Sequence, residues 1–475
     1  MAESDYLRAV EDMEGHYRPC ACRSGTPFFN VRLADNEHSH KTTRSGKLYR
    51  TLYQHDRDTI LYSASFRRLK WKTQIFPEHT ADQLRTRLDH TLEVAQISRH
   101  LARQLRLNED LVDAIALAHD IGHTPFAHSG ERALHQYLRR KGKDLGAEVD
   151  GFKHNWQSLR VVDKLERSYP ELNGLNLTRA VRLGILKHTT LHYPAPHEHE
   201  PCSCDMTIEL ESDFDPNDPS TDLLEVQLVH VADDFAQAVH DFEDALVSDS
   251  MSLEEIVRNP QEYGILKSCL EEIEKRGLKV DKLKLERGEH RDCLVARLRS
   301  ELIFQLTIDC ISSSSARIEA WEKENFGGPL ADGIKMFNYH TETNKHFPNL
   351  IALDKLREPF DGFKRMLLQK VVQSERVSRM DGKSEFLLRR ILDIYLEKPL
   401  QAHDHVLHDY ERAKETLGDT EIRQKSRDEL PAILNEMRND PLFLRVAVDY
   451  VAGMTDRYAI REFDQLYSAY PRADL

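Results

Sequence analysis

The doublet His119-Asp120 is the part of this sequence best suited to chemistry. His90 lies upstream of it, and a run with two more histidines and a glutamate extends from His123 to Glu131. Two imidazoles and a carboxylate are a common ligand set for a catalytic divalent metal, because they bind the ion and leave coordination positions open. Such a set works only where the fold brings its members together, so the surrounding elements decide whether it forms a site.

Apolar periodicity places His90 at the start of a helix. Val94, Ile97, Leu101 and Leu105 follow it at steps of four, three, four and four residues. Residues at this spacing share one face of a helix, and an apolar face packs against the core. We therefore expect the imidazole of His90 to point toward the core of the protein.

A second helix is expected directly after the first. Asn108 is a good N-cap with acidic residues behind it, and the apolar face of the following segment leads to His119. The connector before this helix is so short that the two helices should be antiparallel neighbours. The sequence therefore predicts that His90 and His119 meet at one end of a helical hairpin, with Asp120 following where the second helix stops.

Asp233 is a candidate for a fourth ligand. It lies on the same helical stripe as Val226, Val229 and Ala236, without a lysine or arginine one turn away. A buried carboxylate is costly unless it is paired or bound to a metal. The neighbouring Asp234 points elsewhere and is the weaker candidate. A single histidine on an apolar face is more often a hydrogen-bonded core residue than a ligand, but two histidines converging with two aspartates favour a metal site.

The whole sequence indicates an all-α protein. Its 475 residues allow two or three domains, or one large helical domain with extensions. Long segments carry apolar residues three and four positions apart, and no sustained strand alternation is visible. Helix breaks are expected near Gly327-Gly328-Pro329 and near Asp381-Gly382. We divide the chain into three parts: an irregular N-terminal arm (1–45), a helical catalytic core (46–250) with a loop at 191–220, and a helical C-terminal region (251–475) packed on the core.

Charge and cysteine content narrow the class of protein. The formal net charge of −14 gives no general attraction to nucleic acid or anionic lipid, so a polyanionic substrate needs a local cluster of Lys, Arg and His. The acidic N-terminus lacks the apolar core of a signal peptide, and no run is long enough to span a membrane. Seven cysteines in a chain of this size suggest reduced thiols. We expect a cytoplasmic protein without a membrane partner.

Two segments combine closely spaced metal-binding residue types. These are Cys20-x-Cys22 in the arm, and His197-x-His199 with Cys202-x-Cys204 in the segment 192–206. A second metal, such as zinc, is one interpretation. However, Cys-x-Cys lacks the usual two-residue gap, so a surface loop is the default for both segments.

Six motifs extend the catalytic pattern along the chain: YRTLYQHDRD (49–58), SFRRLKWKTQ (65–74), RTRLDH (85–90), HDIGHTPFAHSGE (119–131), GFKHNWQS (151–158) and DYVAGMTDRYA (449–459). Together they resemble the deoxyguanosinetriphosphate triphosphohydrolase family, which are HD-domain enzymes acting on deoxynucleoside triphosphates. The His-Asp doublet alone is weak evidence for this family, because many HD phosphohydrolases carry it, but the ordered set of six motifs is specific for it. The resemblance covers roughly half of the chain. It implies an all-α fold with an HD-domain helical core and additional C-terminal helices.

The resemblance also implies a metal site and a reaction. The family ligands fall on His90, His119, Asp120 and Asp233. The implied ion is Mn²⁺ or Mg²⁺, with iron or zinc as alternatives, since two nitrogen and two oxygen donors do not choose among them. Family members cut dGTP or another deoxynucleoside triphosphate between the 5′ oxygen and the α-phosphorus, which releases deoxynucleoside and tripolyphosphate. They form homo-oligomers built from dimers, in some cases hexamers, and some are activated by a second nucleotide.

The catalytic residues come from the same comparison. The family's catalytic histidine matches His128, and Glu131 follows three residues later, where it would orient the imidazole or relay its proton. Histidine suits a proton donor near pH 7. His123 and His154 match positions that face the phosphates. Without the resemblance, we would interpret His128 as an exposed residue in the first turn of a helix. We would interpret Glu131 as a first-turn glutamate that the helix dipole favours.

Four further residues match substrate-binding positions. Arg87 corresponds to an arginine of the nucleotide pocket, where its fork suits phosphate. A surface salt bridge with Asp82 or Asp89 is the alternative. Gln74 and Asp241 match the residues that meet the deoxyribose 3′-hydroxyl, and such crowding excludes ribose. Gln237 stands where many members carry a tyrosine against the sugar, so a flexible amide replaces a flat ring there.

Two other functions stay open. One is an HD-domain phosphatase or phosphodiesterase that acts on a nucleoside monophosphate or another phosphoester, which product analysis would distinguish. The other is a regulatory HD protein that binds nucleic acid without turnover. Because all four candidate metal ligands are present, a protein without catalytic activity is disfavoured. The negative net charge disfavours general affinity for nucleic acid. A local groove for a single strand is not indicated, although the sequence leaves room for one.

Overall fold

The structure is a computed structural model that describes residues 13–18, 20–24, 30–33, 50–74, 85–147, 151–170, 172–187, 223–248, 250–278, 280, 288–326, 348–414 and 421–468. Over these ranges it is built from helices, and extended pairing is limited to two isolated bridges, Thr73 with Thr86 and Arg167 with Gly174. The prediction of an all-α fold is therefore confirmed. No helix in the described ranges combines the length and the apolar character needed to cross a bilayer.

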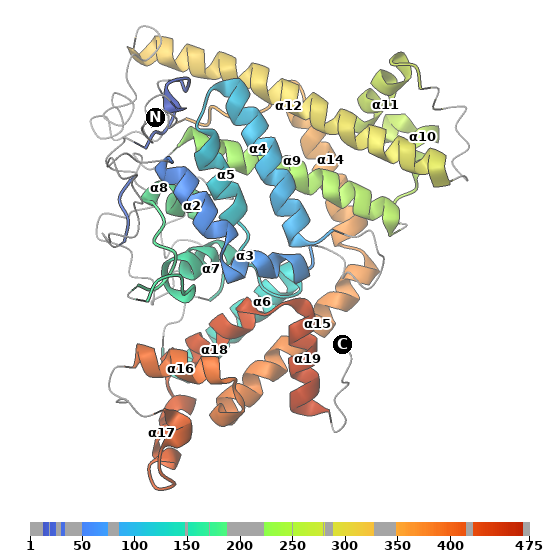
Figure 1. The fold of residues 1–475 in the computed structure, drawn as a ribbon. Coiled ribbons are helices and arrows are strands. Elements are labelled where there is room, and N and C mark those ends of the chain that lie inside the picture. The colour runs from blue at the N-terminus through green and yellow to red at the C-terminus, as the bar shows by residue number, and fades with distance from the viewer. Residues whose placement is uncertain are drawn as a thin grey trace, which may run out of the picture.

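A first core includes five helices of the described chain, among them those that carry the candidate ligands. These are α2 (Leu52–Leu61), α4 (Arg87–Leu105), α5 (Glu109–Ala118), α8 (Arg179–Lys187) and α9 (Leu224–Val247). In Figure 1, α4, α5 and α9 lie together in the upper half of the molecule, and α12 (Gly288–Phe326) runs across the top. Leu101, Ile115 and Val229 are fully buried where these helices meet. The apolar stripes predicted from the sequence thus form the interior of one bundle.

A second core joins α6 (Ala127–Asp144) to the C-terminal helices. Leu134 and Tyr137 of α6 pack with Leu388 of α15 (Glu375–Glu397) and with Val448 of α18 (Pro441–Gly453). Helix α19 (Asp456–Tyr467) completes this unit in the lower half of the molecule (Figure 1). Because α6 begins within the motif 119–131, the C-terminal helices that pack on α6 lie next to the site.

The remaining elements connect and cover these two cores. They are α3 (Ala64–Arg68), η3 (Leu69–Trp71), α7 (His154–Arg160), η5 (Val161–Leu165), α10 (Leu253–Arg258), η7 (Pro260–Tyr263), α11 (Ile265–Lys275), α14 (Arg357–Leu367), η9 (Leu368–Val372), η10 (Pro399–Gln401), α16 (Asp404–Ala413), η12 (Ile422–Gln424) and α17 (Leu430–Arg438).

One predicted helix break is wrong. Helix α15 passes through Asp381-Gly382 without interruption and begins at its N-cap, Ser374, instead. A single exposed glycine costs a helix only about 1 kcal/mol, and the buried residues that follow, such as Leu388, hold the helix in place. The other predicted break, at Gly327-Gly328-Pro329, lies outside the described residues. So do the loop 191–220 and most of the N-terminal arm.

Candidate active site

The helical hairpin that carries the two histidines forms as predicted. A capping box of Thr86 and Asp89 starts α4, and Asn108 caps α5 by accepting hydrogen bonds from two backbone amides of its first turn. The imidazole rings of His90 and His119 lie 5.5 Å apart, centre to centre, at one end of the hairpin. The antiparallel pairing inferred from the short connector therefore brings the two histidines together.

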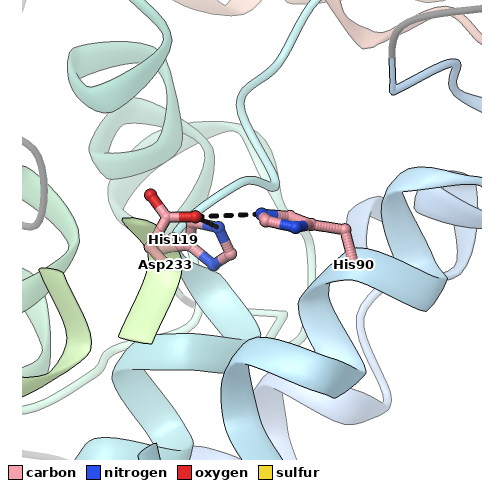
Figure 2. A group of neighbouring side chains, drawn as sticks. All are labelled: His90, His119 and Asp233. Atoms are coloured by element: carbon pink, nitrogen blue, oxygen red, sulfur yellow. Dashed lines mark ion pairs between the residues drawn. The ribbon is translucent and has the colours of Figure 1, made fainter. Parts of the chain in front are cut away.

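Four donor groups converge at this end of the hairpin. Nε2 of His90 lies 3.0 Å from Oδ1 of Asp233, and Nε2 of His119 lies 3.8 Å from the same oxygen (Figure 2). Asp120 closes the group, with Oδ1 3.4 Å from Nε2 of His119 and Oδ2 3.9 Å from Nε2 of His90. Ligand atoms about 2.1 Å from one ion are separated from each other by distances of this size. His90, His119 and Asp233 thus have the geometry of a coordination shell, and Asp120 lies at its edge, where its two oxygens also contact Arg87 and His123.

The outer nitrogens of both histidines are committed to hydrogen bonds. Nδ1 of His119 lies 2.6 Å from the carbonyl oxygen of Ala116 and donates to it. Nδ1 of His90 lies 3.2 Å from Nδ1 of His240, whose Nε2 is 2.7 Å from a carboxylate oxygen of Glu93. The network assigns a consistent direction: His240 donates to Glu93 and accepts from His90. With Nδ1 committed in this way, Nε2 is the nitrogen that each histidine turns toward Asp233.

Two imidazole nitrogens that face two carboxylates need positive charge between them, which a metal ion can supply in place of protons. Burial raises the pKa of Asp120, but His119, His123 and Arg87 outweigh it and hold the pKa well below its usual value. Burial likewise opposes ionisation of Asp233, and the hydrogen bond from His90 together with the charge of His119 still lowers its pKa. Both carboxyl groups are therefore anionic and buried. The residues fit a divalent metal ion.

Arg87 lies at the edge of the predicted metal site. Its guanidinium is 2.7 Å from Oδ2 of Asp120, and only 2% of its side chain is exposed. The alternative of a surface salt bridge with a nearby aspartate does not hold for Asp89, whose carboxylate accepts hydrogen bonds from Thr86. A buried arginine beside the ligands places a fixed positive charge where a phosphate would meet the ion.

A second cluster of histidines begins where the first ends. His123 lies with Nδ1 2.9 Å from Oδ1 of Asp120, and its ring stacks on that of His154 at a centroid distance of 3.9 Å. His154 in turn contacts Glu131, with Nδ1 2.7 Å from a carboxylate oxygen. The distance from Nδ1 of His128 to the same oxygen is 4.0 Å. Glu131 therefore pairs more closely with His154 than with His128.

The pKa values in this cluster are displaced from their ordinary values. Burial opposes the charge of Glu131, but the adjacent His154 and the nearby His128 lower its pKa to about 2. The surrounding protein lowers the pKa of His128 to about 4, and Arg87 and His154 act in the same direction. The side chain of His128 is nevertheless 57% exposed. His128 is thus neutral at pH 7 in the free protein, and a bound polyanion is needed to raise its pKa.

A cavity opens next to His128 between the two halves of the molecule. It encloses about 1190 Å³ of empty space, solvent at its mouth included, and its walls come from η3, the start of α6, α15 and α19. Gln74 and Gln237, two of the predicted substrate-binding residues, line it together with His128. Asp241 lies behind Gln237, with which it forms a hydrogen bond, and burial raises its pKa to about 8. Catalytic and substrate-binding candidates therefore share one cavity.

Glu93 and His240 were missed in the sequence. Glu93 follows His90 by three residues on α4, and His240 precedes Asp241 on α9. A carboxylate three residues after a ligand histidine is a weak signal for a supporting role, because Glu93 also pairs with Arg85, at 3.4 Å. Their partnership required the packing of α4 against α9, which the sequence alone does not specify.

The cysteines of the N-terminal arm are not in a surface loop. Cys20 and Cys22 are both buried, so this expectation was wrong. Sγ of Cys22 lies 3.1 Å from the hydroxyl of Tyr53, and the backbone amide of Cys22 donates to Glu225 at 3.0 Å. Thiols pack as small apolar groups, and the described residues place no metal-binding group at these cysteines. The second segment, 192–206, lies outside the described residues.

Comparisons with known proteins agree with this geometry. A family model described as HD domain matches residues 87–238, and a second, described as phosphohydrolase-associated domain, matches residues 422–465. A deoxyguanosinetriphosphate triphosphohydrolase-like protein of Bordetella pertussis is 37% identical over 423 residues, which are 88% of this chain and 90% of the relative. The protein of the same name from Geobacter sulfurreducens is 32% identical over 474 residues, 99% of this chain and 100% of the relative. The one from Thiobacillus denitrificans is 35% identical, covering 88% and 91%.

The chain belongs to the deoxyguanosinetriphosphate triphosphohydrolase-like family. The resemblance noted in its six motifs is thereby confirmed, and the protein is an HD-domain phosphohydrolase. The HD-domain match begins at the first residue of α4 and includes all four candidate ligands. The phosphohydrolase-associated match covers α17, α18 and most of α19. In this chain the first match thus covers the site-bearing helices, and the second covers helices of the second core.

Proposed function

We propose that the protein hydrolyses deoxynucleoside triphosphates, dGTP among them, to deoxynucleoside and tripolyphosphate in a metal-dependent reaction. The observation that carries the proposal is the convergence of two histidines and two aspartates beside a fixed arginine and a cavity. Nε2 of His90 and Nε2 of His119 lie 3.0 and 3.8 Å from Oδ1 of Asp233, and 3.9 and 3.4 Å from the oxygens of Asp120. The relatives named above carry this activity in their names. Self-assembly and activation by a second nucleotide belong to the same proposal.

His90, His119, Asp120 and Asp233 would hold a divalent cation, with Mn²⁺ or Mg²⁺ as our proposal for its identity. When bound, the ion polarises the α-phosphate and lowers the pKa of a water molecule. Oxygen and nitrogen donors in equal number suit these ions as well as iron or zinc. We assign no further residue of the described chain to the ion.

Arg87 and the histidine cluster act on the phosphate and the leaving group. Arg87, held by Asp120 at 2.7 Å, directs its remaining donors at the phosphate oxygens. His128 is neutral in the free protein, and the charge of a bound triphosphate raises its pKa so that it can protonate the leaving 5′ oxygen. Glu131 accepts a hydrogen bond from Nδ1 of His154 at 2.7 Å, and its negative charge favours the protonated form of His128.

Gln74 and Asp241 recognise the sugar. Over the part of the chain that the structure describes, Oε1 of Gln74 and Oδ1 of Asp241 are buried acceptors that receive no hydrogen bond. A buried polar atom without a partner is costly, and the deoxyribose 3′-hydroxyl can satisfy it. Gln237, hydrogen-bonded to Asp241, occupies the space beside this hydroxyl. This arrangement supports discrimination between deoxyribose and sugars with different hydroxyl patterns.

Product analysis tests the proposal. The purified protein is incubated with each deoxynucleoside triphosphate and Mn²⁺, and the products are resolved by ion exchange. We expect tripolyphosphate and deoxynucleoside in equal amounts. Pyrophosphate with monophosphate, or free phosphate, would show a different HD-domain phosphohydrolase. Retarded migration of single-stranded DNA without any turnover would favour the regulatory alternative.

Matched variants connect the reaction to the proposed ligands. Asp233→Ala and His119→Ala should lose both bound metal and turnover. Asp234→Ala is the control, because Asp234 is the next residue, its carboxylate is paired with Lys364 at 2.8 Å, and 42% of its side chain is exposed. It should keep metal and activity. Bound manganese at the normal level in Asp233→Ala would contradict the ligand assignment.

A further inference from the structure

The C-terminal motif 449–459 contacts the segment that carries the catalytic histidines. Oδ1 of Asp456 accepts the backbone N–H of Phe126 at 2.9 Å, and Oδ2 accepts the backbone N–H of Thr73 at 3.0 Å. Phe126 lies two residues before His128. The buried carboxylate of Asp456, on α19, therefore links the residues that follow η3 to the start of α6. Asp456 lies 330 residues after Phe126 in the sequence.

The backbone that Asp456 holds adopts an unfavourable conformation. Phe126 and Ala127 both lie in the left-handed region, with φ of 63° and 55°. Residues with a Cβ atom rarely adopt this region, and two in succession are rarer still, so the surrounding structure must enforce it. Phe126 is also the N-cap of α6 and caps it without a side-chain hydrogen bond. The direction in which α6 leaves the motif, and with it the place of His128, depends on this turn.

Two further contacts brace the same region from the C-terminal unit. Nζ of Lys72 donates to the carbonyl oxygen of His123 and, at 3.0 Å, to that of Ala452 on α18. Asp449 accepts from Arg160 at 2.8 Å and from Gln157 at 3.1 Å, both on α7. These contacts hold neighbouring backbone in place. The hydroxyl of Thr124 donates to the carbonyl oxygen of Ala127 at 3.0 Å from within the motif, and from the C-terminal unit the carboxylate of Asp456 reaches the left-handed turn.

We propose that Asp456 is a positioning residue that fixes the left-handed start of α6 and thereby sets the place of His128 in the site. In this proposal, the phosphohydrolase-associated segment contributes one carboxylate that positions a catalytic residue of the HD domain. The structural part of this inference is independent of the substrate. Its kinetic part rests on the function proposed above.

Hydrogen exchange of the full-length protein tests the structural part. In Asp456→Asn, the amide NH₂ cannot accept, so one of the two backbone N–H groups loses its acceptor. We expect roughly tenfold faster exchange in peptides that cover residues 123–131 or 70–74. The control is Asp440→Asn, another carboxylate of the same segment, which caps α18 through the amide of Leu442 at 2.9 Å. It should leave both peptides unchanged even where it lowers the melting temperature.

Kinetics separate positioning from simple loss of fold. Asp456→Asn should lower kcat for dGTP hydrolysis at least tenfold, while the stoichiometry of bound Mn²⁺ stays near that of the parent protein. Ala127→Gly in the Asp456→Asn background should restore part of kcat, because glycine adopts the left-handed conformation without strain. A merely destabilising change would not be rescued at that position. Asp440→Asn should retain the parent kcat.

Each outcome decides the proposal. Unchanged exchange over residues 123–131 in Asp456→Asn would overturn it, as would an unchanged kcat or equal effects in Asp440→Asn. Should Asp456→Asn fail to fold, Asp456→Glu retains the charge and displaces the carboxylate by one methylene, and the same comparisons apply to it. If the parent protein leaves dGTP intact, the proposed function fails, whereas the exchange experiment still decides whether Asp456 holds the turn.

Discussion

Replacing Glu93 by glutamine tests whether a residue outside the proposed ligand set affects the affinity of the site for a metal ion. Glu93 touches none of the proposed ligands' donor atoms, and it acts through His240, which it contacts at 2.7 Å. His240 accepts from Nδ1 of His90 at 3.2 Å, so the carboxylate fixes the direction of both hydrogen bonds. Burial raises the pKa of Glu93, but the hydrogen bond from His240, together with the charge and hydrogen bond of Arg85, lowers it to about 2. The variant keeps an acceptor and removes the charge that orients the chain of hydrogen bonds.

The size of the effect follows from the burial of the pair. A hydrogen bond to a charged group contributes about 1.5–3 kcal/mol between buried partners. The side chain of His240 is fully buried, whereas that of Glu93 is 31% exposed, so water screens part of the interaction. We therefore expect a loss of about 1–2 kcal/mol, or roughly tenfold weaker metal binding, at the lower end of the range known for such supporting contacts.

Titration of the metal-free protein with Mn²⁺, followed by the electron paramagnetic resonance of the free ion, measures this affinity directly. Asp234→Asn is the matched control, because it removes the same charge from an exposed position on α9, one residue from the proposed ligand Asp233. It should bind Mn²⁺ as the parent protein does. Native affinity in Glu93→Gln, or equal weakening in both variants, would refute the reasoning.

Three further variants probe neighbouring parts of the site. His128→Ala should retain bound metal and lower kcat by roughly 10²–10⁴-fold, as measured by metal analysis and steady-state rates. Gln74→Ala should reduce the preference for a 2′-deoxy over a 2′,3′-dideoxy triphosphate by roughly tenfold, the contribution of one hydrogen bond. For Asp241, the raised pKa of about 8 means that the folded state binds more protons than the unfolded state above pH 4, so stability falls as pH rises from about 4 to about 8. Asp241→Asn should therefore gain melting temperature relative to the parent protein at pH 8, and little at pH 4; an equal shift at both values would contradict the assignment.

The sequence predicted the parts of the site that depend on local signals. The meeting of His90 with His119 follows from apolar periodicity, the N-cap Asn108 and a short connector, all of which act within one hairpin. Asp233 could be singled out because a carboxylate on an apolar helix face is costly unless it is paired or bound to a metal. These arguments require no knowledge of distant contacts, and the structure places the three side chains together (Figure 2).

Features set by long-range packing could not be read in the same way. No local signal marks Phe126 and Ala127 as left-handed, since neither residue type favours that conformation. The carboxylate that faces this turn, Asp456, arrives from the far end of the chain. The break wrongly expected at Gly382 has the complementary cause, because burial of the rest of α15 outweighs the cost of one glycine.

Anomalous X-ray diffraction from crystals grown with Mn²⁺ tests the central claim most directly, because it locates the ion without reference to any activity. We predict one strong peak at the end of the α4–α5 hairpin, about 2.0–2.3 Å from Nε2 of both His90 and His119 and from carboxylate oxygens of Asp120 and Asp233. Crystals of Asp233→Ala should lack it. A peak elsewhere in the molecule, with these four side chains turned away from one another, would contradict the account.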